Sequence, residues 1–217
     1  MRKLLAVLSL SLMSMLYVSA ANSAGFGAGV TISAGEMETS GTETEKTVSG
    51  VTSGTESKTI SEGFAGVSVY AEIKDFIFDG FTIGVDYVPY DIDLGKGNRQ
   101  DTSATEANAG VDVGERSASA EASDLTTIYV NIPLPGPFYG LAGYHDVSIT
   151  TTESLPTSTY GDVDINGTMF GLGLKGDHQK LEIAYSDFDS ISLESTANTN
   201  KITADMDAWQ LRYSLGF

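Results

Sequence analysis

The feature that most constrains this chain is an alternation of apolar side chains with polar or small ones. It is clearest in the C-terminal segment AWQLRYSLGF, where Trp209 and every second residue after it are apolar or aromatic. Successive side chains of a β-strand point to opposite faces of a sheet, so this period of two indicates strands with one apolar face. Helical periodicity is poor, and Gly, Thr and Ser are too frequent for a helical bundle. The sequence therefore predicts an all-β fold.

The alternation predicts eight strands, which lie near residues 25–35, 65–74, 81–87, 127–132, 137–149, 170–175, 180–186 and 208–217. Three of the connections between them are short. The other four are long and polar, and they cover residues 36–60, 91–124, 150–164 and 189–206. Short turns at one end of the strands and long loops at the other end are typical of an outer-membrane barrel.

A soluble β-sandwich also alternates, so other features must separate it from a barrel that crosses a membrane. Charged residues and Gly share the polar faces, as in a narrow, filled lumen. Aromatic residues stand at the ends of the apolar faces: Trp209 and Phe217 would be about 20 Å apart in height, and Phe81 and Tyr87 bracket another strand. We therefore predict an eight-stranded antiparallel transmembrane β-barrel over residues 25–217, with an aromatic girdle that includes Phe81, Tyr87 and Trp209.

The segment before residue 25 is predicted to be a cleaved secretory signal peptide. Two basic residues precede an apolar run from Leu4 to Val18, and small residues follow up to Ala24. The run is shorter than the roughly 18–20 residues of a membrane helix. The small residues predict cleavage between residues 20 and 24.

The composition excludes several classes of function. The formal net charge of −17 argues against nucleic-acid binding, because contacts with phosphates need clustered Lys and Arg. The chain has no Cys, so it can form no disulfide, no thiolate zinc site and no cysteine nucleophile.

Three weaker patterns suggest ligand or catalytic sites, and each is incomplete. Residues 162–167 (DVDING) open like an EF-hand loop, but the twelfth position is Gly173 instead of Glu, so we interpret the segment as a turn. The GxGxxG pattern at residues 171–176 is not followed by a helix. His145 and Asp146 are adjacent, and adjacent strand residues point to opposite faces. We therefore predict no catalytic residue, no bound cofactor and no metal ligand.

Charged residues on the polar faces are predicted to meet inside the barrel. They are Glu72, Lys74, Asp86, Lys180, Glu182 and Arg212. The lumen of an eight-stranded barrel is barely wide enough for side chains, and buried charges need partners. We expect a plug of paired charges, in which Arg212 pairs with Glu72 or Asp86. A narrow path for ions or water is the alternative.

The last strand supports a more specific comparison. It ends in Phe217 and carries Leu211, Tyr213 and Leu215 at alternate positions, and it resembles the insertion signal that the barrel assembly machinery reads. Residues 25–217 resemble the small eight-stranded outer-membrane proteins of the OmpA-barrel, OmpX, OmpW and opacity type. The resemblance implies a monomer in contact with the lipid of a Gram-negative outer membrane, with its termini and short turns on the periplasmic side.

The function expected from these observations is non-enzymatic. The long acidic loops suggest an envelope-structural or surface-interaction protein, and an extracellular ligand or a phage could bind to them. A solvated fringe without a partner fits the same composition. The alternatives are a narrow porin or OmpW-like channel for small or apolar solutes, and a soluble periplasmic β-barrel or sandwich that binds a ligand.

Overall fold

The computed structural model describes residues 25–46, 52–101, 114–153, 160–195 and 201–216. The predicted signal peptide and Phe217 lie outside these ranges. The strands are β1 (Gly25–Lys46), β2 (Thr52–Lys74), β3 (Thr82–Tyr87), β4 (Ile92–Asp101), β5 (Gly114–Pro133), β6 (Phe138–Glu153), β7 (Asp162–Lys175), β8 (Gln179–Glu194) and β9 (Lys201–Gly216). No helix among the described residues is long and apolar enough to cross a membrane.

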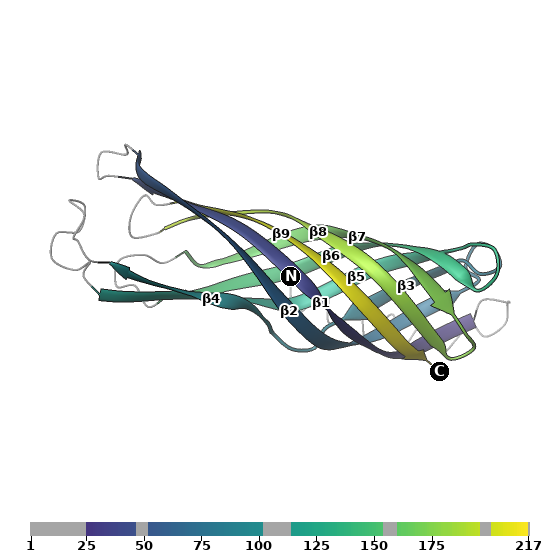
Figure 1. Ribbon diagram of the computed structural model, residues 1–217. Helices are drawn as coiled ribbons and strands as arrows, with labels where there is room; N and C mark the ends of the chain where they lie inside the picture. Colours follow the sequence, from purple (N-terminus) through teal and green to yellow (C-terminus); the bar gives the residue numbers. More distant parts are fainter. Residues whose placement is uncertain (1–24, 47–51, 102–113, 154–159, 196–200, 217) are drawn as a thin grey trace.

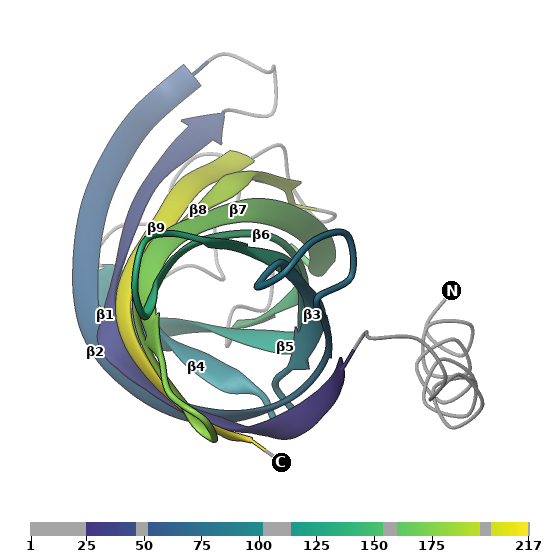
Figure 2. The same cartoon turned by 90° about the vertical axis from the view of Figure 1, so that its right-hand side faces the viewer.

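The strands form one closed antiparallel barrel (Figures 1 and 2). Their order is β3-β2-β1-β9-β8-β7-β6-β5-β4, and β3 also pairs with β5, which closes the ring. β3 and β4 both lie along β5, one after the other, so the nine strands occupy eight positions around the ring. The predicted eight-stranded antiparallel barrel is confirmed.

The strands are much longer than the sequence suggested, and the prediction of long polar loops is wrong for most of their length. β1 and β2 stay paired from Gly25↔Lys74 out to Lys46↔Thr52, through the segment 36–60. Rows of Ser and Thr side chains link the two strands there, for example Ser40 Oγ to Thr59 Oγ1 at 2.9 Å. β-Branched Thr suits a strand even where neither face is apolar, and cross-strand hydroxyl pairs stabilise the pairing.

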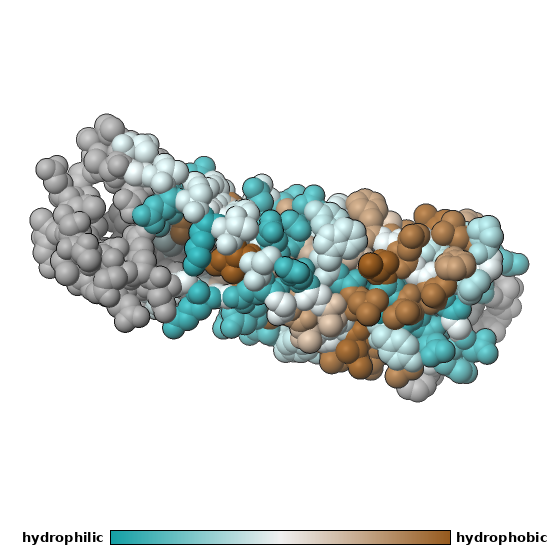
Figure 3. All heavy atoms as spheres, in the orientation of Figure 1, coloured by the Kyte–Doolittle hydropathy of each residue, from teal (hydrophilic) through white to brown (hydrophobic). Residues whose placement is uncertain are grey.

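The barrel has two halves with different outer surfaces. The turn half carries Gly25, Gly216 and the three short turns, and its outer wall is covered by exposed apolar side chains (Figure 3). These include Phe26, Val30, Ile32, Val67, Val69, Ile128, Ile132, Phe170, Leu172, Leu174, Leu181, Ile183, Leu211 and Leu215. We call them the apolar band. The other half of the barrel, the far half, has a polar outer wall.

The polarity of the wall reverses between the two halves, and β9 shows this most simply. In the turn half, Leu211 points outward and Arg212 points inward; in the far half, Asp205 points outward and Met206 points inward. β7 and β8 reverse in the same way. The interior of the far half is an apolar core of Met37, Ala122, Val147, Ile149, Tyr160, Ile165, Ile191, Leu193, Met206 and Ala208. The far half therefore has an apolar interior and a polar outer wall, as in a water-soluble barrel. The turn half has the opposite arrangement, with a polar interior and an apolar outer wall.

Candidate functional site in the lumen

A network of ion pairs fills the lumen of the turn half. Arg212 on β9 lies between two carboxylates: its Nη2 is 2.9 Å from Asp86 Oδ2, and its Nη1 is 3.4 Å from Glu182 Oε2. Lys180 Nζ lies 2.7 Å from Glu72 Oε2. Glu72, Asp86, Glu182 and Arg212 are all buried. The structure thus brings together five of the six predicted lumen charges, and Arg212 contacts Asp86, whereas Glu72 is held by Lys180. Lys74, the sixth, has a side chain that is 41% exposed and lies 3.7 Å from Glu72.

Three tyrosines complete this network. Tyr129 OH donates to Glu72 Oε2 at 3.0 Å, and Tyr139 OH donates to Glu182 Oε1 at 2.6 Å. Lys180 Nζ lies 4.3 Å from the centre of the Tyr70 ring. Sequence reasoning did not assign these tyrosines to the network, although Tyr70 and Tyr129 alternate in step with polar residues, which is a signal for an inward position.

Inward-facing glycines make room for the tyrosine rings. A Cβ atom on Gly173 would lie 2.2 Å from Cζ of Tyr139, and a Cβ atom on Gly84 would lie 2.4 Å from Cζ of Tyr129. Real Cβ atoms do not approach so closely, so both positions need glycine. This explains Gly173 in the GxGxxG pattern as a packing requirement of the lumen.

The predicted aromatic girdle residues lie at two different levels. Trp209 and Tyr87 are exposed on the outer wall near the level where the polarity reverses. The Trp209 ring packs against Tyr185 with 4.9 Å between ring centroids. Phe81 lies at the opposite edge of the apolar band, in the turn before β3, where it packs against Phe78 at 5.2 Å.

The residues of the predicted insertion signal share one face of β9. Leu211, Tyr213 and Leu215 all point outward and are exposed in the apolar band. Tyr213 OH donates to Gln179 Oε1 at 2.8 Å on β8. Phe217, the last residue of the signal, lies outside the described residues.

A cavity of about 360 Å³ lies in the lumen directly beyond the ion-pair network. Its floor is polar and includes Asp86, Arg212, Gln210 and the hydroxyls of Thr127 and Ser186. Its walls belong to the apolar core of the far half and to residues packed on it, among them Met37, Phe64, Leu125, Val147, Phe188 and Met206. The cavity therefore has one polar end and one apolar end.

His145 also lines the cavity, beside Thr127 and Ser186. Its Nδ1 lies 2.7 Å from Thr127 Oγ1, its Nε2 lies 2.9 Å from Ser186 Oγ, and its ring stacks on Phe188 at 5.1 Å. A catalytic Ser–His pair needs an acid on the other ring nitrogen, and here the hydroxyl of Thr127 occupies that place. The arrangement offers hydrogen bonds to a ligand but no triad.

Two residues that follow in the sequence, Asp146 and Ser148, are not brought to His145. Asp146 is exposed on the outer wall, and Ser148 Oγ donates to Asp164 Oδ1 at 2.6 Å. Asp164 belongs to the EF-hand-like segment, which lies inside β7, so its interpretation as a turn is wrong. The alternation of Val163 and Ile165 continues the strand. No group of three or more His, Asp or Glu among the described residues could hold a metal ion.

One side of the cavity lies at a seam in the barrel wall. The pairing of β2 with β3 ends at Val69↔Tyr87, and β4 pairs with β5 but not with β2. Side chains bridge this seam: the Val67 amide donates to Tyr90 OH, and Glu62 approaches Gly95. Glu62, Tyr90, Asp91 and Asp93 line the cavity on this side.

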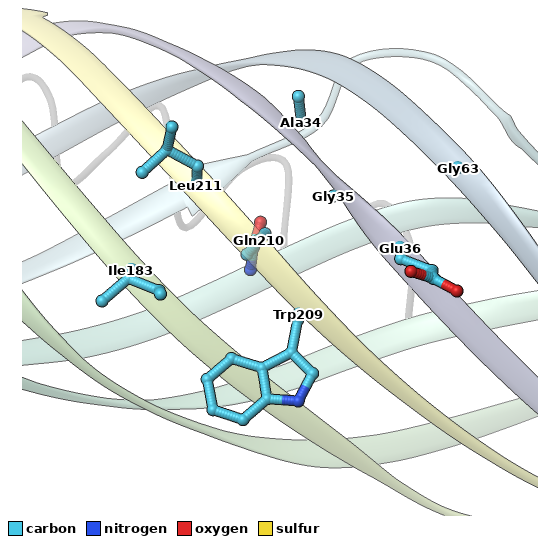
Figure 4. A pocket seen from close by; sticks show the side chains of 8 residues that line it. All are labelled: Ala34, Gly35, Glu36, Gly63, Ile183, Trp209, Gln210 and Leu211. Carbon is cyan, nitrogen blue, oxygen red and sulfur yellow. The ribbon is translucent and has the colours of Figure 1, made fainter.

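A second hollow, of about 490 Å³, lies on the outer wall where the polarity reverses (Figure 4). Trp209, Ile183 and Leu211 line its apolar side, and Glu36 lies on its polar side. Gly35 also lines the hollow, and a Cβ atom there would lie 2.0 Å from the Trp209 carbonyl oxygen. The hollow thus marks the edge of the apolar band on β1, β8 and β9.

Comparison with known proteins yields similarity in structure only. No family model matches the chain, and no curated protein sequence matches it. The chain is similar to the outer membrane protein OprG from Pseudomonas aeruginosa, with a TM-score of 0.48, 13% identity, and 87% of this chain and 96% of that chain covered. It is also similar to Ail, the attachment invasion locus protein of Yersinia pestis (TM-score 0.38, 10% identity, 88% and 99% covered). Neisserial surface protein A gives a TM-score of 0.37 at 10% identity, with 88% and 99% covered. At these values the likeness does not extend to a function.

Proposed function

We propose that this chain is a non-enzymatic outer-membrane barrel protein of a Gram-negative bacterium, which presents a closed-bottomed binding barrel at the cell surface. The reversal of wall polarity carries the proposal. From Phe26 to Ala34, β1 is apolar on its outer face, and these eight steps rise about 20 Å at a ~40° tilt, close to the ~25 Å apolar band of such barrels. Beyond Ala34 the outer face is polar and suits water.

A soluble periplasmic barrel explains this wall poorly. Monomeric soluble proteins rarely expose large contiguous apolar patches, and here several strands expose them at the same level. Trp209 and Tyr185 at the edge of the band suit the interface of a bilayer, where an aromatic ring has one apolar and one wet side. In this orientation the termini and the short turns face the periplasm, and the far half faces the medium.

The filled lumen supports a role other than conduction. Arg212, Lys180 and their acidic partners, together with Tyr129 and Tyr139, occupy the lumen of the turn half. We expect the refolded protein to give no unitary currents in planar bilayers. Reproducible currents from the wild-type protein would overturn the closed lumen and favour the second candidate, a channel for small or apolar solutes. The cavity and its seam are the observations that favour such a channel.

The membrane proposal has a separate and simpler test. Unboiled and boiled samples of the outer-membrane fraction should run at different positions on an SDS gel, because a barrel stays folded until it is boiled. Identical mobility, with the protein in the soluble periplasmic fraction, would instead support the soluble binding barrel.

We further propose that Leu211, Tyr213, Leu215 and Phe217 serve as the insertion signal for the barrel assembly machinery. The shared outward direction of the three described residues supports this role. We propose that the outward-facing acidic residues of the far half can contact an extracellular ligand or a phage. We also propose that the protein is a monomer, because the ring is closed within one chain.

A further inference from the structure

We propose that the cavity in the lumen binds a small cationic amphiphile, that is, a molecule with an apolar body and an amine or quaternary ammonium group. The inference rests on the proposed function in one respect, since the surrounding medium must supply the ligand to the far half. It adds the chemical class of the ligand, which the barrel architecture alone does not determine.

The size and polarity of the cavity indicate an amphiphile. Its volume of about 360 Å³ falls in the range of small-molecule sites, which are concave, mostly apolar and furnished with a few polar groups. An apolar body can lie against Phe64, Val147, Phe188 and Met206, which line one end. A purely polar ligand would leave these side chains without apolar contact.

The charges that line the cavity select the sign of the polar group. Four acidic residues line it, Glu62, Asp86, Asp91 and Asp93, against a single Lys or Arg, Arg212, among its described lining residues. Asp86 is buried, and the other three are exposed at the seam. The positive charge of Arg212 is already compensated by two carboxylates, Asp86 at 2.9 Å and Glu182 at 3.4 Å, so Arg212 does not attract an anionic ligand. The lining is therefore net negative, which favours a cation and disfavours a carboxylate.

The three remaining carboxylates lie together at the seam. Glu62 belongs to β2, and Asp91 and Asp93 lie at the start of the β4 segment opposite it. No ion pair is recorded for any of the three within the described residues. Asp93 Oδ1 accepts a hydrogen bond from the amide of Gly95, at 2.8 Å. The geometry thus puts the ammonium group at the seam and the apolar body toward the inner wall.

An aromatic ring stands at the same place. Tyr90 lines the cavity beside Asp91, and its hydroxyl accepts a hydrogen bond from the amide of Val67. An ammonium group near the face of an aromatic ring gains cation–π attraction, and such rings are used to recognise quaternary ammonium ligands. Carboxylates and a tyrosine together suit a methylated amine better than a metal ion, which needs converging oxygen ligands.

Binding of three matched probes tests the sign of the charge. The full-length mature protein is refolded into nanodiscs of zwitterionic lipid, and hexyltrimethylammonium, hexanol and hexanoate are titrated by calorimetry, with empty nanodiscs subtracted. We expect the ammonium probe to bind at least about tenfold more tightly than either of the others, since several carboxylate contacts add up. Equal or tighter binding of hexanoate, or no binding by any probe, would overturn the proposal.

Two sets of charge variants show where the cation binds. The triple variant Glu62→Gln, Asp91→Asn, Asp93→Asn should weaken binding of hexyltrimethylammonium about fivefold at low salt. The control Glu38→Gln, Asp205→Asn, Asp207→Asn removes the same charge from the outer wall and should leave binding unchanged. An equal loss in both variants would mean attraction by the whole surface, and the proposed site would be wrong.

A filling variant tests the apolar end. Ala208 lines the cavity and is 6% exposed, so Ala208→Leu should reduce the space for the apolar body and weaken binding. Ala34→Leu adds the same atoms on the outer wall and serves as the control. Every variant is first checked for the gel shift of the folded barrel; if Ala208→Leu does not fold, the charge variants still decide. A folded, membrane-inserted barrel that binds none of the probes refutes this inference and leaves the proposed function intact.

Discussion

Replacing Arg212 by methionine should destabilise the barrel more than any surface change. Arg212 is 6% exposed, and it is the cation between Asp86 and Glu182, which are 5% and 2% exposed. The variant leaves both carboxylates buried without their shared cation. Breaking a buried ion pair from one side typically costs about 3–5 kcal/mol.

The remaining contacts place the expected loss at the lower end of that range. Tyr139 OH still donates to Glu182, and Ser68 still bonds to Asp86. Methionine has an unbranched, flexible side chain that adapts to irregular spaces, and Met169, whose Sδ lies 3.6 Å from Arg212 Nη1, offers it an apolar neighbour. We therefore expect Arg212→Met to lower the free energy of unfolding by about 3 kcal/mol, measured by reversible urea unfolding of the protein in lipid vesicles.

A compensated variant separates charge from packing. Arg212→Met combined with Asp86→Asn and Glu182→Gln removes the unpaired charges while keeping acceptors for Ser68 and Tyr139. Its stability should return to within about 1 kcal/mol of the wild type, because neutral groups can replace a buried ion pair at little cost. A single variant that loses less than about 1 kcal/mol, or a compensated variant no better than the single one, would refute this account of the lumen.

Three further predictions concern the wall and its assembly. Gly173→Ala should cost about 1–3 kcal/mol in the same unfolding assay, because its Cβ would collide with Tyr139, whereas Gly140→Ala, which meets nothing within 4 Å, should be neutral; equal effects would contradict the packing argument. Trp209 is the only Trp in the chain and lies at the edge of the apolar band, so lipids brominated near the headgroup should quench its fluorescence more than lipids brominated at the chain ends. The reverse order would refute the placement of Trp209 at the edge of the band. Deletion of Phe217 should lower the amount of assembled, heat-modifiable protein while Phe217→Tyr should not, and unchanged surface levels in both would count against the insertion signal.

The turn half of the fold was predictable because each strand there alternates clearly. The far half was not, since the segment 36–60 has only scattered apolar residues such as Met37, and composition alone makes it look like a loop. A readable signal was nevertheless present in β7. Val163 and Ile165 are apolar at odd positions, and Phe170 and Leu172 are apolar at even positions, so the apolar residues change face within one continuous strand.

The charged residues of the lumen site were predictable, but its tyrosines and its contacts were not. The parity of Glu182 and Arg212 along their strands predicts inward positions, because their neighbours are apolar. The partner of Arg212, however, is Asp86, 126 residues away, and only the closure of the ring through β3 and β5 determines that they meet. Thr127 and His145 are directly opposite each other in the β5–β6 pair, and Ser186 contacts His145 from β8.

The reversal of wall polarity determines how deeply the barrel sits in a bilayer. A slide toward the periplasm would draw Glu36 and Asp207 into hydrocarbon and expose Leu215 and Phe26 to water, and a slide outward would expose Ile32 and Leu211 to water. The protein therefore has a single resting height. Its apolar band of about 20 Å matches a thin bilayer, and in a thicker one the lipid must thin around the barrel at a fraction of a kcal/mol per Å of mismatch. The same pattern that encodes the strands would thus also sort the protein among membranes of different thickness.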